Sequence, residues 1–360
     1  MKQRFLAISL LLLSFWLPAA DPEPLVSVGV CETPPKLDGR LDDPCWRTCI
    51  EIGGFAVAGT QISAQARTSA LFTRDTSHLY VAIRASQLDM SDLKPASRVH
   101  DDADMWRNDC VELFIDRNGD RQTFFQLMIN RLGTLYDSKC NMAAPRDGRN
   151  DPSWESGAKV VSGTERTAWI IEASVPLRAL GGPVAIGDLW RVNVVRDNPS
   201  DGEASTWVPL DEHKWHVPGQ FAPTKFSDRT PGLRFGSAHT SADGEEFEFE
   251  VTGGGTDVYA LTLDIPPYAH QRQDLKLAVG KTMTASVQHN SSNWRSTPDR
   301  GLTIALTADG VELFRWVRHH LRPFIEVKVA PLANGDTEPR CISRDWPTAF
   351  QTVTRHTFPG

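Results

Sequence analysis

The sequence predicts an all-β protein: an antiparallel β-sandwich of the immunoglobulin or jelly-roll type, followed by a second, smaller β-rich domain. Three observations support this class. Short stretches of alternating apolar and polar residues recur along the chain. Gly, Asn, Asp and Pro separate these stretches, and no long amphipathic helix interrupts them. Many short strands with turns between them are typical of a β-sandwich.

Residues 1–20 are expected to be a secretory signal peptide. Lys2 and Arg4 precede the apolar stretch FLAISLLLLSFWL, and LPAA supplies small residues for cleavage near Ala20. This stretch is short for a membrane span, and no later run reaches about 18 apolar residues. We therefore expect a secreted protein, extracellular or periplasmic, that contacts a membrane only if the signal stays uncleaved.

Residues 24–228 are expected to form the first domain. SALFTRD and HLYVAIRAS alternate around a turn, and DCVELFID, RNGD and TFFQLMIN together predict a β-hairpin. GTLYDS, GAKVVSG, TAWIIEASVPL and DLWRVNVVRD continue the series of strands. We expect four tryptophans in the core of this domain: Trp46, Trp169, Trp190 and Trp207.

A linker is expected at residues 229–244, because SDRTPG and GSAHTSADGEE are polar and rich in Gly and Ser. Beyond it, FEFEVTG, DVYALTLDI and GLTIALTADGVELFRWV again alternate like strands. Residues 245–360 are therefore expected to form a β-rich domain, for which the sequence indicates no role.

Charge and cysteine content narrow the function classes. The net charge of −7 gives no electrostatic reason to expect a nucleic acid or an anionic membrane as partner. In an oxidising compartment an even number of cysteines predicts disulfides, although the sequence leaves their pairing open. No CxxC pair is present to suggest a zinc site. The six cysteines are Cys31, Cys45, Cys49, Cys110, Cys140 and Cys341.

Six stretches, in order, resemble carbohydrate-binding module family 9. They are PPKLDGRLDDPCW (34–46), HLYVAIRA (78–85), DMWRNDCVELFID (104–116), WIIEASVPLRALG (169–181), LWRVNVVRDN (189–198) and WHVPGQFAPTKFS (215–227). The resemblance covers about residues 25–230 and implies a two-sheet β-sandwich that binds the ends of cellulose- or xylan-type chains. It also implies that structural calcium is common and that such modules are often attached to glycoside hydrolases.

The same resemblance implies a sugar site. Trp106 and Trp215 stand where the family clamps a sugar ring between two tryptophans, and Glu112 stands at the strand glutamate six residues after the first. A pyranose has apolar C–H faces that pack on an indole, while carboxylates and amides bind its hydroxyls. Because Glu112 alternates with Val111 and Leu113, it projects from the opposite face of the strand.

The next strand departs from the family pattern. Gln126 and Met128 stand where the family carries an arginine and an asparagine that face the sugar. Gln126 can still bond hydroxyls, whereas Met128 can only pack. The nearby candidates to compensate for this loss are Arg107, Asn108, Asn130 and Arg196.

Two acidic runs suggest calcium. The first holds Asp101, Asp102 and Asp104, and the second holds Asp116, Asn118 and Asp120. Clustered carboxylate and amide oxygens suit Ca²⁺, although we favour solvated turns as the explanation of these runs.

We therefore expect a secreted, non-catalytic protein that binds a plant-type or other polysaccharide and associates with secreted glycoside hydrolases. The sequence has no GxSxG or HExxH motif and no spacing that frames a catalytic carboxylate pair. Three alternatives stay open. These are a surface or adhesion protein without a small ligand, a glycoside hydrolase chain acting on O-glycosyl bonds, and a haem-binding sandwich that uses Met128 and His216.

Overall fold

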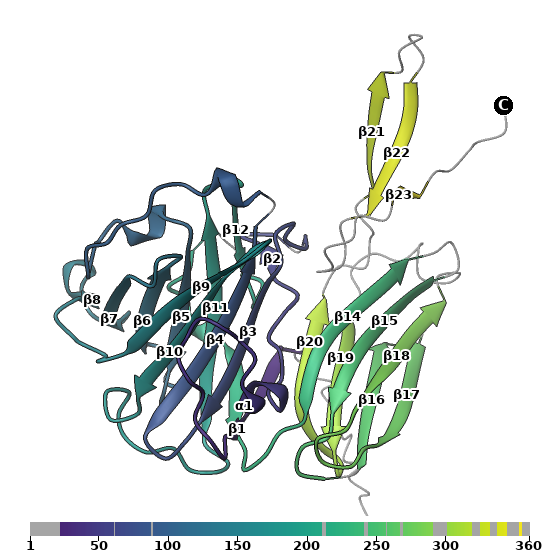
Figure 1. Ribbon diagram of the computed structural model, residues 1–360, viewed down its shortest axis with the longest axis horizontal. Coiled ribbons are helices and arrows are strands. Elements are labelled where there is room, and N and C mark those ends of the chain that lie inside the picture. The colour runs from purple at the N-terminus through teal and green to yellow at the C-terminus, as the bar shows by residue number, and fades with distance from the viewer. Residues whose placement is uncertain are drawn as a thin grey trace, which may run out of the picture.

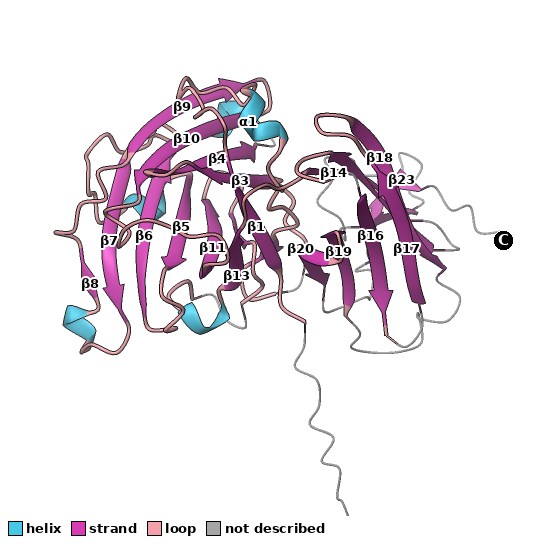
Figure 2. Ribbon diagram, turned by 90° about the horizontal axis from the view of Figure 1, so that it is seen from below, coloured by secondary structure: helices cyan, strands magenta, loops and turns pink. Residues whose placement is uncertain are grey.

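The computed structural model describes residues 22–60, 62–87, 89–210, 214–240, 244–256, 258–266, 269–290, 301–318, 325–331, 337–343 and 353–354. The expected signal peptide and the side chain of Cys341 lie outside the described part. Two lobes lie side by side in both ribbon views (Figures 1 and 2). No helix among the described residues is long and apolar enough to cross a membrane.

The first lobe is a sandwich of two sheets. In one sheet, the strands β9 (Lys159–Glu165), β10 (Ala168–Pro176), β4 (His78–Ser86), β3 (Thr68–Arg74) and β1 (Leu25–Val30) lie in this order. The facing sheet contains β8 (Asn150–Asp151), β7 (Leu135–Asn141), β6 (Thr123–Asn130), β5 (Cys110–Asp116), β11 (Leu189–Asn198), β13 (Ala222–Phe226) and again β1. Figure 2 shows the two layers facing each other. The all-β prediction and the predicted β5–β6 hairpin are confirmed.

Short elements close the ends of this sandwich. Strand β12 (Glu203–Thr206) pairs with the end of β11 and with β2 (Ala56–Val57). The only α-helical turn in the described residues is α1 (Pro44–Arg47). The 3₁₀ turns are η1 (Met90–Asp92), η2 (Met105–Arg107), η3 (Arg146–Gly148) and η4 (Pro218–Gln220).

The second lobe is a smaller sandwich joined to the first through β1. Strands β17 (Ala269–Lys276), β16 (Val258–Ile265), β19 (Leu302–Ala308) and β20 (Val311–Arg318) form one sheet, and β20 pairs with β1. The other sheet contains β14 (Gly232–Thr240), β15 (Gly244–Thr252) and β18 (Thr282–Asn290). A third sheet is formed by β21 (Ile325–Pro331), β22 (Thr337–Ser343) and β23 (Val353–Thr354).

The expected linker at 229–244 is corrected by the structure, because most of it is strand β14. Phe235 on this strand is 4% exposed, and its ring lies 5.3 Å from that of Phe249. The backbone N–H of Phe235 donates to Glu51 of the first lobe at 2.9 Å. Leu233 and Phe235 alternate with polar residues and so bury one face of a strand within a segment of linker-like composition. The two lobes consequently share one apolar core.

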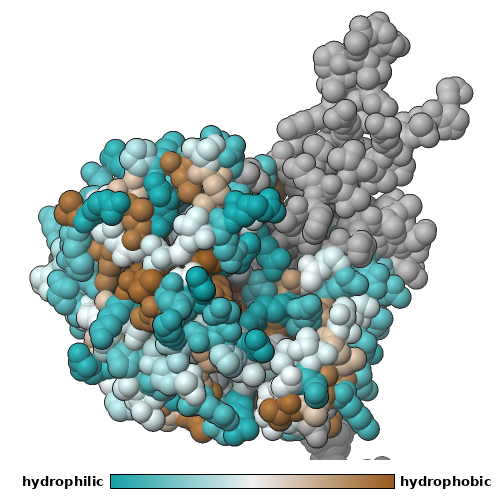
Figure 3. Space-filling view, in the orientation of Figure 1, coloured by the Kyte–Doolittle hydropathy of each residue, from teal (hydrophilic) through white to brown (hydrophobic). Residues whose placement is uncertain are grey.

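The core of the first lobe contains the expected tryptophans. Trp46, Trp169, Trp190 and Trp207 are each at most 2% exposed. Trp46, on helix α1, also donates from Nε1 to Glu172 at 3.1 Å. The other carboxylate oxygen of Glu172 accepts the backbone N–H of Gly39 at 2.9 Å, which holds the acidic turn LDGRLDD on β10. The surface seen in Figure 3 is largely hydrophilic, with a few apolar residues gathered near the middle of the first lobe.

The disulfide prediction is wrong for the described cysteines. Cys31, Cys45, Cys49, Cys110 and Cys140 are all unpaired, and four of them are buried. Burial raises the pKa of the Cys45 thiol to about 12 and that of Cys140 to about 11. Because the thiolate is the reactive form, these cysteines act as small apolar residues of the core.

The second lobe contains a buried charge network that generates a pH prediction. Glu245 accepts from Arg318 at 2.7 Å and lies 3.0 Å from His289 Nε2, and all three side chains are almost fully buried. These partners outweigh desolvation and lower the pKa of Glu245 to about 2. The stabilisation is fully present above the unfolded pKa of about 4.3 and is lost as pH falls toward 2.

We expect Glu245→Gln to destabilise the protein at pH 7 by roughly 3 kcal/mol, and by much less near pH 3. Urea unfolding at the two pH values measures the difference, and Glu250→Gln, an exposed carboxylate on the same strand, is the matched control. An equal loss at both pH values would contradict the network.

Candidate functional site

The candidate site lies on the outer face of the second sheet of the first lobe. Along β5, Val111, Leu113 and Ile115 point into the core between the sheets. Side chains alternate along a strand, so Glu112 and Phe114 lie on the outer face. This face is covered by loops, which leaves Glu112 only 2% exposed.

A cavity of about 670 Å³ opens on this face. Its floor comes from β5, β6, β7 and β11, and its walls come from η2, from the loop between β11 and β12 and from residues 215–216. A volume of this size accommodates a small ligand. The lining residues are Ala103, Trp106, Arg107, Glu112, Gln126, Met128, Tyr136, Asn150, Asp197, Asn198, Pro199, Gly202, Glu203, Ala204, Trp215 and His216.

Two tryptophans form aromatic walls of the cavity. Trp106 on η2 is 51% exposed. It is the only aromatic residue among the large apolar residues that are exposed in the described part of the chain. The guanidinium of Arg107 lies over the Trp106 ring, 4.8 Å from its centroid, and pairs with Asp104 at 3.0 Å. Trp215 is half-buried and packs against the outer cluster around Phe114 and Phe124. Both rings therefore offer surface to a ligand.

The floor of the cavity carries a pair of acidic side chains. Glu112 accepts from Gln126 Nε2 at 2.6 Å and is hydrogen-bonded to Asp197. Burial, together with the negative charge of Asp197, raises the pKa of the Glu112 carboxyl well above its usual range. The folded protein therefore holds the Glu112 proton to higher pH than the unfolded chain does.

Gln126 is held in one orientation by its neighbours. Its Oε1 lies 3.2 Å from His216 Nε2 and accepts from Ser138 at 3.4 Å, so its Nε2 faces Glu112. Burial lowers the pKa of His216, which keeps the imidazole neutral near pH 7. The imidazole stacks on Phe124 with a ring distance of 5.7 Å. The cavity floor is therefore preorganised around Gln126.

Met128 makes apolar packing contacts and offers no hydrogen-bond donor to a ligand. It forms a small buried cluster with Met105 and Tyr136 beneath one end of the cavity. The Tyr136 hydroxyl accepts from Asn150 Nδ2 at 2.7 Å, which leaves the phenol proton free to donate.

Two predicted site residues do not line the cavity. Arg196 lies on the opposite face of β11 from Asp197, where it donates to the Ser86 carbonyl at 2.6 Å and lies over the Trp169 ring. Asn130 lies on the correct face, but its side chain binds backbone groups of Ser97, Leu132 and Thr134. The period-two geometry of a strand excludes Arg196. The other five predicted site residues line the cavity together: Trp106, Trp215, Glu112, Gln126 and Arg107.

Three features of the cavity were not predicted from the sequence: Asp197, the role of His216 in positioning Gln126, and the Tyr136–Asn150 pair. The alternation of side chains along β11 could have identified Asp197. It lies on the same face of that strand as Val195, which pairs with Glu112. Tyr136 and Asn150 carry no signal of their own, because their position depends on the pairing of β7 with β6 and β8.

The second acidic run does not fit a metal ion. Asp116 uses both carboxylate oxygens to accept the backbone N–H groups of Gly119 and Arg121. Asp120 likewise accepts from Gln122, Thr123 and Asn118. Since N–H and O–H donors already occupy these oxygens, the run forms a tight turn.

The first acidic run is divided between two roles. Asp102 accepts the backbone N–H of Asp104, and Asp104 pairs with Arg107. Asp101 instead lies in a group with His100 and Glu155 whose ligand atoms are all within 4.8 Å of one another. Carboxylate oxygens at this spacing fit a hard cation such as Ca²⁺.

Asp137 lies beside this group. Its backbone N–H donates to Asp101 at 3.3 Å, and its carboxylate accepts from the backbone of Ser156 at 2.9 Å. Asp137 is fully buried, and its Oδ1 has no hydrogen-bond partner in the described part of the chain. An orphaned carboxylate oxygen at this junction favours a cation nearby.

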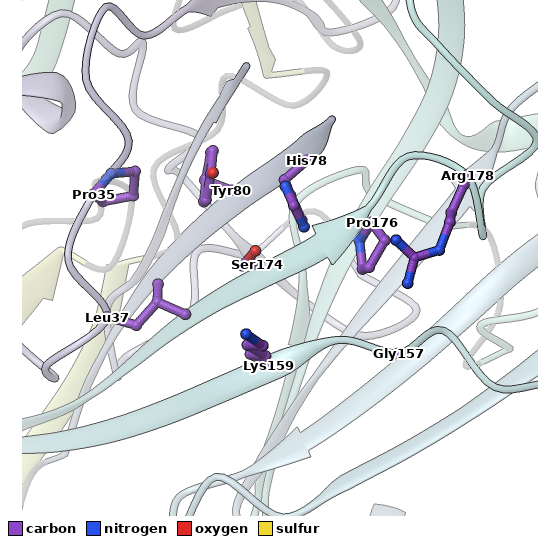
Figure 4. Close-up of a pocket in the computed structure, with 9 residues that line it drawn as sticks. All are labelled: Pro35, Leu37, His78, Tyr80, Gly157, Lys159, Ser174, Pro176 and Arg178. Atoms are coloured by element: carbon purple, nitrogen blue, oxygen red, sulfur yellow. The ribbon is translucent and has the colours of Figure 1, made fainter. Parts of the chain in front are cut away.

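A second hollow, of about 430 Å³, lies on the outer face of the other sheet. Figure 4 shows Ser174 at its centre, with Lys159, His78 and Arg178 around it. It contains no tryptophan and no buried carboxyl group, so it offers fewer groups to orient a ligand than the cavity over β5.

Comparison with known proteins agrees with the resemblance to carbohydrate-binding module family 9. The model of the family described as carbohydrate family 9 binding domain-like matches residues 37–227. Among curated proteins, endo-1,4-beta-xylanase A of Thermotoga neapolitana is 22% identical over 189 residues. That match covers 52% of this chain and 16% of the xylanase, so the chain spans a small part of that relative.

Two solved structures illustrate the similarity. A family 9 carbohydrate-binding module from Caldicellulosiruptor kristjanssonii, in complex with cellotriose, is 14% identical, with a TM-score of 0.42. The match covers 57% of this chain and 95% of that one. A putative carbohydrate-binding protein from Bacteroides uniformis is 16% identical, with a TM-score of 0.47, and the match covers 57% of this chain and all of that one.

The acidic pair generates a stability prediction. Because the folded pKa of Glu112 is raised, the unfolded chain loses this proton at a lower pH than the folded chain does. The pair therefore destabilises the fold increasingly as pH rises from about 4.3 toward the folded pKa. We expect the stability of Glu112→Gln relative to the natural protein to be greater at pH 8 than at pH 4.5, because glutamine has no proton to lose. Urea unfolding at both pH values tests this, and a pH-independent difference would contradict the raised pKa of Glu112.

Proposed function

The chain belongs to the carbohydrate family 9 binding domain-like family, and from this premise we propose that it is a carbohydrate-binding protein whose cavity over β5 holds a sugar ring. One observation carries the proposal: two tryptophans wall a cavity whose floor consists of buried, oriented hydrogen-bonding groups. That combination suits a ring with apolar faces and polar edges.

The geometry suggests how each group contributes. The indoles of Trp106 and Trp215 pack on the C–H faces of the ring and exclude water from them. Gln126 and the acidic pair bond hydroxyls at the floor, and they lose little entropy because their neighbours already hold them in place. Asn150 and Tyr136 bond hydroxyls at the side. Affinity for one ring should lie in the micromolar range or weaker, since the contact area is small.

The arrangement of the carboxyl groups supports sugar binding without hydrolysis. A glycosidase needs two carboxyl groups about 5–10 Å apart, one on each side of the scissile bond. Glu112 and Asp197 instead bond each other, so a substrate cannot pass between them. Glu203, the third acid lining the cavity, accepts the backbone N–H groups of Gln65 and Ala66.

We propose that the protein is secreted and works beside glycoside hydrolases. The N-terminal sequence supports secretion. The xylanase relative supports a role beside glycoside hydrolases, since the matching stretch is only a part of that enzyme. Polysaccharide is then the partner, and hydrolysis belongs to another protein.

The tryptophan walls generate a binding prediction. We expect Trp106→Ala and Trp215→Ala each to weaken binding of cellobiose or xylobiose by tenfold or more, because each removes one stacking face. Isothermal titration calorimetry of the mature chain measures this. Trp154→Ala is the matched control, since Trp154 packs on Phe125 and lies outside the cavity. Unchanged affinity in both wall variants would contradict the site.

We also propose that calcium binds where Asp101 and Glu155 meet and ties the segment before η2 to the loop before β9. Its role would be structural, since it would neutralise carboxylates that lie near the buried Asp137. No step of sugar recognition passes through it.

Calcium should therefore raise the melting temperature. We expect a rise of a few degrees in millimolar CaCl₂, reversed by EDTA and absent in Asp101→Asn. Asp120→Asn, in the run that fits no metal, should keep the full effect. Differential scanning fluorimetry distinguishes these outcomes, and a rise that persists in Asp101→Asn would place calcium elsewhere.

A further inference from the structure

The smaller hollow lies on the outer face of the sheet formed by β9, β10, β4, β3 and β1. Its lining contains Lys159, Arg178 and His78 but no aspartate or glutamate among the described residues. It holds about 430 Å³, a size that accommodates a small ligand. The chain as a whole carries a net charge of −7, so this local excess of positive charge runs against the composition of the molecule. The hollow is therefore a candidate site for an anion.

Strand pairing builds the floor of the hollow. Ser174 on β10 pairs with Tyr80 on β4 and with Lys159 on β9, so one row of residues crosses three strands. Two residues further along β10, Pro176 pairs with His78 and forms the adjacent row. Directly paired residues point to the same face of a sheet, so both rows face the hollow. Figure 4 shows Ser174 at the centre of this arrangement.

The floor presents a hydrogen-bonding group that the protein itself does not use. Ser174 is 8% exposed, and its hydroxyl has no hydrogen-bond partner in the part of the chain that the structure describes. The Tyr80 hydroxyl, in contrast, donates to Asp75 at 2.7 Å. Buried polar groups of proteins are usually hydrogen-bonded, so the unpartnered hydroxyl at the base of this hollow favours a ligand that bonds to it.

Two cations of the hollow are uncompensated. Lys159 and Arg178 are exposed, and their side chains make no ion pair or hydrogen bond with any described residue. Like charges that line one hollow repel each other, and an anion bound between them relieves that repulsion.

The acidic side chains on the surrounding elements are engaged elsewhere. Asp75, in the turn before β4, accepts the Tyr80 hydroxyl and two backbone N–H groups. Glu172, on the same strand as the floor serine, accepts two backbone N–H groups and an indole N–H. Asp38, on the loop that forms one wall, pairs with Lys36 at 3.0 Å. The two cations of the hollow are therefore open to a charge that a ligand brings.

We propose that this hollow is a second carbohydrate-binding site, which takes a sugar that carries a carboxylate, a hexuronic acid. The carboxylate is inferred from the hollow itself, and only the sugar ring rests on the proposed function. Arg178 can bind a carboxylate through two parallel N–H bonds, and Lys159 can neutralise it as a point charge. The Ser174 hydroxyl can donate to the same carboxylate or accept from a hydroxyl of the ring.

The remaining walls of the hollow suit a sugar ring. Pro35 and Leu37, from the loop before α1, lie on one side of the hollow, and Pro176 lies on the other (Figure 4). These apolar surfaces and the face of Tyr80 can pack on the C–H groups of a pyranose, while the cations bind its carboxylate. Phosphate or sulfate has no such face and would leave this surface uncovered. The lining therefore favours an acidic sugar over an inorganic anion.

The test is methyl NMR of the mature full-length chain with labelled leucine, because Leu37 lines the hollow and reports binding there. Its signals are assigned by Leu37→Val. The chain is titrated with the methyl glycosides of glucuronic acid and of glucose, and with sodium sulfate, all at constant ionic strength. We expect the glucuronide to shift the Leu37 signals saturably, with an affinity in the millimolar range or tighter. It should bind at least about fivefold more tightly than the glucoside or sulfate.

Variants separate the hollow from general charge effects. Lys159→Gln and Arg178→Gln should each weaken glucuronide binding by about threefold or more, because each removes one cation from the site. Arg166→Gln is the matched control, since it removes an exposed cation from the turn between β9 and β10, outside the hollow, and should preserve binding. Circular dichroism establishes that each variant is folded.

Each outcome decides one question. If the glucoside binds at Leu37 as tightly as the glucuronide, or if both hollow variants bind the glucuronide as well as the natural chain does, the carboxylate is not recognised and the inference is overturned. If sulfate binds as tightly as the glucuronide, the hollow is a general anion site and the sugar assignment is overturned. If none of the three ligands shifts the Leu37 signals, the hollow is not a site.

Failure of the proposed function gives a different result. The hollow and the cavity over β5 share no lining residue among those described. Trp106→Ala should therefore weaken cellobiose binding and retain the shift that the glucuronide causes at Leu37. If the natural chain binds no neutral disaccharide while the glucuronide still shifts Leu37, the proposed function fails and the assignment of a carboxylate to the hollow stands.

Discussion

The alternation of side chains along β5, β6 and β11 is the constraint on which the site depends. One face of these strands supplies Val111, Leu127 and Val194 to the core between the sheets. Because this core fixes the register of the strands, the other face must present Glu112 and Asp197 together. The cavity is thus a consequence of core packing, and its chemistry follows from which polar residues occupy the outward positions.

A second constraint joins the lobes. Strand β1 pairs with β13 and β3 in the first lobe and with β20 in the second. The apolar core runs on from the first lobe to Phe235 and Trp316 of the second. Division of the chain near residue 237 would break both the sheet and this core. The second lobe therefore supports the sandwich that carries the cavity, although none of its described residues lines the cavity.

Much of this arrangement could be predicted from local sequence. The strand periodicity and the RNGD turn determine the β5–β6 hairpin, and the resemblance to family 9 indicated Trp106 as a wall of the site. Other features depend on long-range register. The assignment of Arg196 to the site was wrong because its side chain lies on the opposite face of β11. Asp197 was not predicted because its nearness to Glu112 follows from the pairing of β5 with β11. The linker prediction failed because Gly- and Ser-rich composition concealed the apolar alternation of Leu233 and Phe235. The disulfide prediction failed even though Cys31, Cys45 and Cys49 lie in one apolar cluster, because an even count of cysteines does not show whether neighbouring thiols pair.

The central claim is that a sugar ring lies between Trp106 and Trp215, over the acidic pair. The most direct measurement is two-dimensional NMR of the indole N–H signals of the mature chain during titration with soluble β-1,4-linked disaccharides, with each signal assigned by single substitution. The account predicts saturable shifts of the Trp106 and Trp215 signals, while those of the buried Trp46, Trp169, Trp190 and Trp207 stay in place. Sugar-dependent shifts confined to other tryptophans, or none at all from a folded protein, would contradict it.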